Sequence, residues 1–206
     1  MYFSNGDKWN DLQDRALMKR CHQYGGCFSW STVENIAMWM LYGGECGKKG
    51  AMLDFPQSTM LELLETKSIE LGSFDKASFE PKITLSAEKD FTISLTDVVY
   101  SQFSAKGDKA TLTLGDEHAV VPAEILNHVD IFHKYYAWAY EHECRLIIHI
   151  NKEIMNDQDM PPVARIHLSD TALRTLKGNL YRSPVFKGSS DLGQPSKLYR
   201  QVDWSL

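Results

Sequence analysis

Hydrophobic and polar positions alternate most regularly in the middle of the chain. Apolar side chains at 91, 93 and 95 are separated by Thr or Ser at 92, 94 and 96, which is the two-residue period of a half-buried strand. Two more strands are predicted at 111–114 and 118–121, because Gly115 and Asp116 between them suit a hairpin turn. The middle of the chain is therefore expected to be rich in strands.

Shorter apolar runs elsewhere predict further strands. These runs are bounded by glycine, proline or polar residues, which commonly end a strand. The predicted strands lie at 27–29, 51–55, 144–150, 163–168 and 198–204.

Helices are predicted where apolar residues recur three or four positions apart. A short helix is expected within residues 5–20, and Ser31 with Glu34 forms a capping box for a helix reaching Tyr42. Another short helix is expected at 59–65, and Ser169 is placed to cap one that ends near Gly178. The longest is predicted over about 122–140, where Ile, Val, Phe and Tyr at 125, 129, 132 and 136 follow helical spacing after Pro122.

Short helices around a central group of strands favour an α+β fold. We expect a mixed or antiparallel sheet core, several short helices and the one long helix over about 122–140. A length of 206 residues suits a single domain, 1–206.

Composition narrows the classes of function. The net charge of −5 argues against broad binding to nucleic acid, which requires clustered basic residues. The apolar runs are too short for a membrane helix, and no signal peptide is visible at the N-terminus. The four cysteines form no CxxC pair, and the seven histidines show no metal-ligand spacing, so we expect reduced thiols, a cytoplasmic location and no metal site.

The segment Tyr140–Arg145 is the first candidate site. On a strand, Glu141 and Glu143 would project from the same face. One carboxylate could then bind a ribose hydroxyl while the other acts as a base or stabilises a cationic transition state. The alternative is a solvated face on which Glu141 pairs with Arg145 across a helical turn.

The segment 27–31 with the helix after it is the second candidate site. A strand that ends at Ser29, followed by a helix N-terminus, could hold an anionic or ribose group. The same predicted helix carries Trp39 and Tyr42, which are candidate ligand-binding residues together with Ser29. The alternative is that Ser29 and Ser31 only cap the helix and the two rings only pack.

Three blocks of residues resemble a widespread, largely bacterial family known as a domain of unknown function. The blocks are Tyr2-Phe3-Ser4-Asn5 with Trp9-Asn10-Asp11, then Cys27-Phe28-Ser29 with Asn35, Met38-Trp39 and Tyr42, then Lys134, Trp138, Tyr140-Glu141, Glu143 and Arg145-Leu146. The resemblance covers residues 1 to about 150, a family-like core, and leaves 151–206 as a strand–helix–strand tail. It implies no established activity.

The order of strand, serine, helix and strand with a later E-x-E is also distantly similar to ADP-ribosyltransferase-type folds. That similarity implies NAD as a cofactor, Ser29 as the residue that positions it and Glu143 as the catalytic residue. It implies that Glu141 orients the acceptor or ribose, and Arg145 is a further candidate ligand-binding residue. The transferase fold carries an Arg or His on a first strand before the serine, and this strand is expected to be missing because the chain begins at the first block.

Two functions follow as the main hypotheses, and a nucleic-acid-processing enzyme is a third, which the net charge of −5 disfavours. The first is a non-catalytic binding or regulatory module with a protein partner, in phage defence or a toxin system. The alternative is an ADP-ribosyltransferase-like enzyme that uses NAD. They differ in whether a hollow joins Ser29 to a reactive Glu143.

Overall fold

The structure is a computed structural model, and it describes residues 1–5, 22–30, 38, 51–106, 109–114, 117–122, 132–154 and 159–182. The described residues belong to two compact units. Unit 1 comprises Met1–Trp30 and Thr66–Ile166, and unit 2 comprises Ser31–Glu65 and His167–Leu206.

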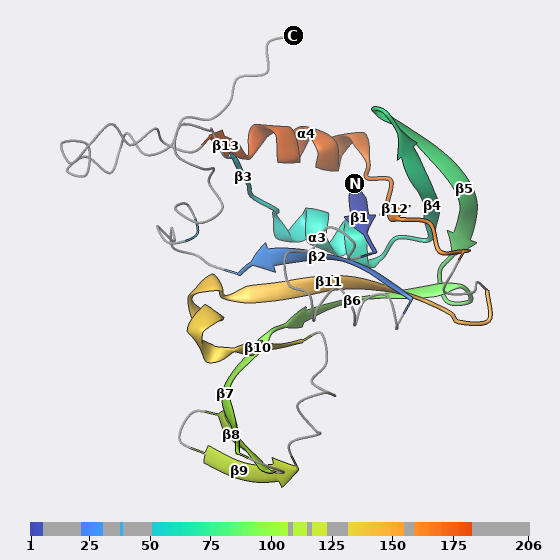
Figure 1. The fold of residues 1–206 in the computed structure, drawn as a ribbon. Helices are drawn as coiled ribbons and strands as arrows, with labels where there is room; N and C mark the ends of the chain where they lie inside the picture. Colours follow the sequence, from blue (N-terminus) through green and yellow to red (C-terminus); the bar gives the residue numbers. More distant parts are fainter. Residues whose placement is uncertain are drawn as a thin grey trace, which may run out of the picture. The chain divides into compact units, whose positions relative to one another are not determined.

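Unit 1 contains two sheets (Figure 1). The seven-stranded sheet has the order β5-β4-β12-β1-β2-β11-β6, and all its neighbouring strands are antiparallel. Its strands are β1 (Tyr2–Ser4), β2 (Gln23–Ser29), β4 (Ser68–Asp75), β5 (Ser78–Ser86), β6 (Phe91–Asp97), β11 (Glu143–Ile150) and β12 (Val163–Arg165).

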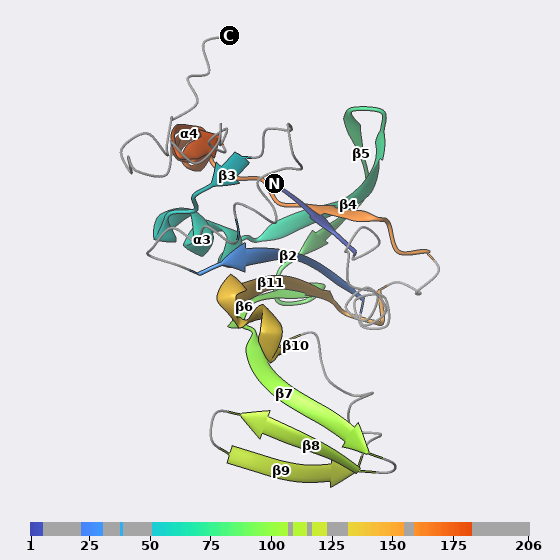
Figure 2. The same ribbon diagram turned by 60° about the vertical axis from the view of Figure 1, so that its left-hand side comes forward.

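The second sheet of unit 1 has four strands in the order β10-β7-β8-β9. They are β7 (Val99–Lys106), β8 (Lys109–Leu114), β9 (Glu117–Pro122) and β10 (His133–Tyr135), and the 3-10 helix η2 (Tyr136–Glu141) follows β10. The strand β7 continues directly from β6, as Figure 2 shows. The pairing of β10 with β7 is parallel, whereas the other two pairings are antiparallel.

The segments 51–65 and 167–182 of unit 2 contain two helices and a small sheet. The helices are α3 (Gln57–Leu64) and α4 (Asp170–Gly178), and β3 (Ala51–Leu53) pairs with β13 (Leu180–Arg182). Ser169 caps α4, since its side chain accepts a hydrogen bond from the backbone N–H of Ala172 at 3.2 Å. The cap predicted from the sequence is confirmed.

The core of unit 1 lies along β11, which is buried on both faces. The face that carries Leu146 and Ile148 packs with Tyr24 of β2, and all three side chains are fully buried. The Tyr24 hydroxyl donates to the carbonyl of Pro161 at 2.7 Å, so the polar end of this ring is satisfied inside the core. Burial on both faces explains why three consecutive apolar residues, 146–148, occur in β11 in place of a strict alternation of apolar and polar positions.

The α+β prediction is wrong, because the described residues are mostly sheet. No long helix occurs in the part of the predicted range 122–140 that the structure describes: Pro122 ends β9, residues 133–135 form β10 and only 136–141 are helical, as 3-10 helix. The backbone N–H of Val99 donates to the carbonyl of Phe132 at 2.7 Å, and β10 then pairs with β7. Tertiary pairing of an aromatic, strand-favouring run therefore outweighs the helical spacing.

Several strands predicted from the sequence are confirmed, among them 91–96, the hairpin at 111–121 and the strand at 144–150. The helix within 5–20 and the strand at 198–204 fall outside the described residues. Of the helix predicted to begin at Ser31, only Met38 is described, and it is helical.

Candidate functional site

The pairing of β2 with β11 brings the two predicted segments together. Ser29 lies directly opposite Glu143, and Cys27 lies opposite Arg145. Residues opposite each other in an antiparallel pair share a face of the sheet, and so do residues two apart on one strand. These four side chains therefore start from one face at one end of the two strands.

The chain enters β11 through a tight turn at His142. This residue has φ 44°, in the left-handed region, and its N–H donates to the carbonyl of Ala139 at 3.2 Å. Its own carbonyl accepts from the N–H of Trp30 at 2.7 Å. The turn places Glu141 at the end of η2 rather than on a strand, so the expectation that Glu141 and Glu143 share a strand face is wrong.

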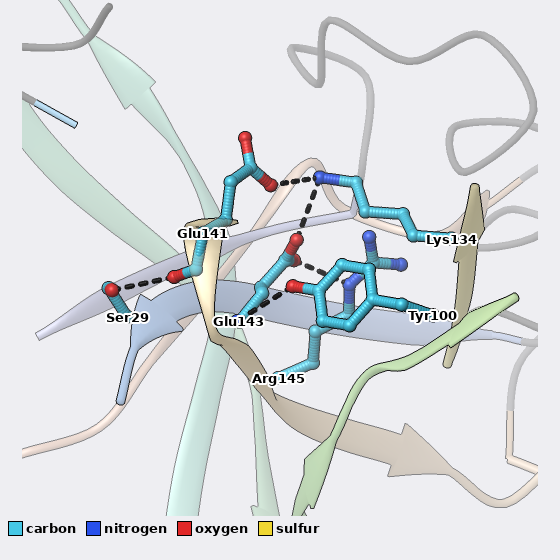
Figure 3. A network of polar contacts seen from close by, with 6 residues as sticks. All are labelled: Ser29, Tyr100, Lys134, Glu141, Glu143 and Arg145. Carbon is cyan, nitrogen blue, oxygen red and sulfur yellow. Dashed lines mark hydrogen bonds and ion pairs between the residues drawn. The ribbon is translucent and has the colours of Figure 1, made fainter. Parts of the chain in front are cut away.

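The two carboxylates nevertheless converge on one cation, Lys134 of β10 (Figure 3). The Lys134 Nζ lies 2.6 Å from Glu141 Oε2 and 2.8 Å from Glu143 Oε2. The other oxygen of Glu143, Oε1, accepts from Arg145 Nε at 2.7 Å. The result is a chain of ion pairs, Glu141–Lys134–Glu143–Arg145, which we call the ionic cluster.

The ionic cluster is shielded from solvent, and its four groups carry charges of both signs. Glu141, Glu143 and Arg145 are only 3%, 6% and 1% exposed, and the Lys134 side chain is the most accessible, at 18%. Two carboxylates face two cations. Burial of a charge without a partner is costly, so the four groups stabilise one another only as a complete set.

Two hydroxyl groups hold the backbone around the cluster, as Figure 3 shows. The Ser29 hydroxyl donates to the carbonyl of Glu141 at 2.6 Å, and the Tyr100 hydroxyl accepts from the N–H of Glu143 at 2.8 Å. These bonds connect β2 to η2 and β7 to β11. Ser29 thus positions the backbone of Glu141, and this hydrogen bond does not involve the Glu143 carboxylate.

The electrostatic surroundings favour the charged forms of Glu143 and Lys134. Burial alone would raise the pKa of Glu143, but the hydrogen bond and charge of Arg145, with contacts from Cys27 and Lys134, lower it below its usual value. Burial alone would lower the pKa of Lys134, but its hydrogen bonds to Glu141 and Glu143 raise it. Desolvation and the Glu143 charge raise the pKa of the Cys27 thiol, which makes that thiol a poor nucleophile.

The structure brings together four of the six predicted site residues: Ser29, Glu141, Glu143 and Arg145. The other two, Trp39 and Tyr42, lie outside the described residues. Arg145 pairs with Glu143 rather than with Glu141 across a helical turn.

Two residues of the site had no role in the sequence interpretation. Lys134 is one of the residues in the third block that resembles the family. A lysine seven and nine positions before two glutamates is the signal that could have suggested an ion pair. The sequence around Tyr100 gives no such signal. Tyr100 lies near Glu143 because the chain passes from β6, which pairs with β11, into β7.

This arrangement limits the chemistry of Glu143. Each of its carboxylate oxygens accepts a hydrogen bond from a cation, Lys134 Nζ or Arg145 Nε, and the residue is only 6% exposed, so little of the carboxylate is accessible in this arrangement. Among the residues described, no group of three His, Cys, Asp or Glu side chains could hold a metal ion.

Comparisons of the chain with protein-family models, with curated proteins and with solved structures found no match. In the described part of the chain, no helix has both the length and the apolar character needed to cross a membrane.

Proposed function

We propose that the protein is a non-catalytic binding or regulatory module with a protein partner. The observation that carries this proposal is the state of Glu143, which is only 6% exposed and whose two oxygens accept hydrogen bonds from Lys134 and Arg145. A catalytic carboxylate must reach its substrate with at least one oxygen. The ionic cluster is better suited to fixing β10, η2 and β11 in one arrangement.

A surface next to the cluster supports the choice of a protein partner. Tyr136 and Trp138 of η2 are 55% and 43% exposed, and Tyr135 beside them is also exposed. No charged side chain occurs from 135 to 140. Centres of protein interfaces are enriched in Trp and Tyr and depleted of charge, so this short segment has the composition of a binding surface.

The cluster fixes the geometry of that surface. Lys134 Nζ lies 5.4 Å from the centre of the Trp138 ring, and the rings of Trp138 and Tyr140 are 6.1 Å apart. The lysine that joins the two carboxylates therefore also contacts an exposed ring. Side chains held in place before binding lose less entropy on association.

The bacterial cytoplasm is the compartment we propose for this module. Cys27 and Cys144 are both free thiols, which is the usual state of cysteine in a reducing compartment.

An ADP-ribosyltransferase-like enzyme is the second candidate, and the pairing of Ser29 with Glu143 is the observation that favours it. Nicotinamide release from NAD separates the two. We expect no release above that of buffer alone, with or without bacterial lysate as a source of acceptors. Release by the wild type that is lost in Glu143→Gln would reject the binding-module proposal.

Binding itself is tested by affinity purification and quantitative mass spectrometry with the whole chain in three forms, the wild type and two variants. We expect the double variant Tyr136→Ala/Trp138→Ala to lose at least one protein that the wild type retains. The matched control is Phe74→Ala, which removes an exposed ring on β4 away from the η2 segment. If all three chains retain the same proteins, the η2 segment is not the binding surface.

A further inference from the structure

We infer that Lys134, together with Glu143 and Arg145, forms a carboxylate-binding site that Glu141 fills from within the chain. The inference adds a ligand class to the proposed function. It rests on that function for one point, namely that a carboxylate of the partner can replace the carboxylate of Glu141. The site itself can be tested with acetate alone.

The charges of the cluster are the first reason. Lys134 and Arg145 contribute two positive charges, and Glu143 contributes one negative charge. Without Glu141, the remaining three groups carry a net charge of +1 in surroundings that exclude most solvent. An anion in the place of Glu141 would restore the balance of charge among these three groups, and an unbalanced buried charge is strongly unfavourable.

The anchoring of the four groups is the second reason. Glu143 and Arg145 lie on β11, which pairs with β2 on one side and β6 on the other. Glu141 instead ends η2, a six-residue 3-10 helix with no side-chain hydrogen bond at its N-terminal cap. Short 3-10 helices have poorer hydrogen-bond geometry than α-helices. The Ser29 hydroxyl holds the carbonyl of Glu141, whereas Glu143 and Arg145 are held by strand pairing on both sides. Glu141 is therefore the carboxylate whose backbone can leave its position at the lower cost.

The chemistry of the ligand follows from the same groups. Glu141 contacts Lys134 Nζ through one carboxylate oxygen at 2.6 Å, and its charge of −1 balances the site. A second carboxylate of similar size would reproduce this contact and this charge. Phosphate carries on average more than one negative charge near neutral pH, about −1.5, so it matches the charge of the site less well than a carboxylate does.

Chemical rescue of Glu141→Ala in the full chain tests the inference. We expect its melting temperature to fall below that of the wild type and to rise again, saturably, with sodium acetate. Sodium chloride at equal ionic strength should not restore it, and phosphate should restore it less than acetate. If the variant is unfolded in chloride, the expected result is folding on addition of acetate.

The control is the double variant Lys134→Met/Glu141→Ala, which lacks the cation that acetate would contact. Acetate should stabilise this double variant and the wild type no more than chloride does. An equal acetate effect on the single and double variants, or no effect on the single variant, would overturn the inference.

Equal rescue by phosphate would overturn the preference for a carboxylate. Neither result would alter the nicotinamide or affinity-purification experiments, so failure of this inference can be told apart from failure of the proposed function.

Discussion

Ser29 and Glu143 lie opposite each other across β2 and β11, yet the Ser29 hydroxyl donates to the carbonyl of Glu141. The serine therefore holds η2 against the sheet, while Arg145 and Lys134 bind the Glu143 carboxylate. The two segments converge, but their contacts are those of a scaffold that holds secondary-structure elements together.

Removal of the shared cation should destabilise unit 1. In Lys134→Met, two buried carboxylates lose their common partner, and we expect the free energy of unfolding to fall by about 3 kcal/mol. Urea denaturation measures this change. Lys82→Met, on the exposed strand β5, is the matched control and should change stability by less than about 0.5 kcal/mol. Equal effects of the two substitutions would show that the cluster contributes little.

Acid should remove the contribution of Glu143. Its pKa is lowered in the folded state, chiefly because the hydrogen bond and charge of Arg145 outweigh the effect of burial. Its stabilising effect is therefore complete above the unfolded pKa of about 4.3 and is lost as the pH falls through the lower folded value. Denaturation of wild type and Glu143→Gln at several pH values should give a stability difference that is large at pH 7 and shrinks below pH 4. A difference that does not vary with pH would contradict the lowered pKa.

Gly72 should tolerate no side chain. It lies at an irregularity in the β4–β5 pairing, and a Cβ there would lie 2.1 Å from the carbonyl oxygen of Glu80, a backbone atom that cannot easily move. We expect Gly72→Ala to cost about 2 kcal/mol. Gly26→Ala is the comparison, because its Cβ would meet the Phe3 ring at 3.3 Å, where a side chain can shift. Thermal or urea unfolding should therefore rank Gly72→Ala as the more damaging, and the reverse order would be inconsistent with this geometry.

The turn at His142 should accept glycine readily. Its φ of 44° lies in the region that costs a non-glycine residue roughly 1 kcal/mol, and only backbone contacts of this residue are needed for the turn. We expect His142→Gly to be as stable as the wild type or up to about 1 kcal/mol more stable. His142→Val should be destabilised, since a branched side chain is disfavoured at positive φ. Comparison of the unfolding midpoints of the two variants tests whether residue 142 has a positive φ. A valine variant as stable as the glycine variant would contradict the left-handed conformation.

Local patterns predicted the strands and the capped helix α4 well. The apolar run over 144–150 and Ser169 as a cap both depend on neighbours in sequence, and both are confirmed. The long helix over 122–140 was wrong, because the spacing of four apolar residues does not reveal that β10 pairs with β7. Such a pairing is a property of the whole fold.

The site was predictable only in part for the same reason. The sequence indicated Ser29, Glu141, Glu143 and Arg145 as chemically interesting, but it could not supply the register of β2 against β11. It also could not show that Lys134 lies between the two carboxylates, which turns a candidate catalytic pair into a neutralised cluster.

The state of the Glu143 carboxyl group is the most direct test of this account. Carbon-detected NMR of the side-chain carboxyl, followed through a pH titration with and without NAD, measures it. The account predicts a carboxylate that titrates below the usual pKa of a glutamate and whose chemical shift is unchanged by NAD. A carboxyl group with a raised pKa, or one whose chemical shift moves saturably as NAD is added, would contradict it.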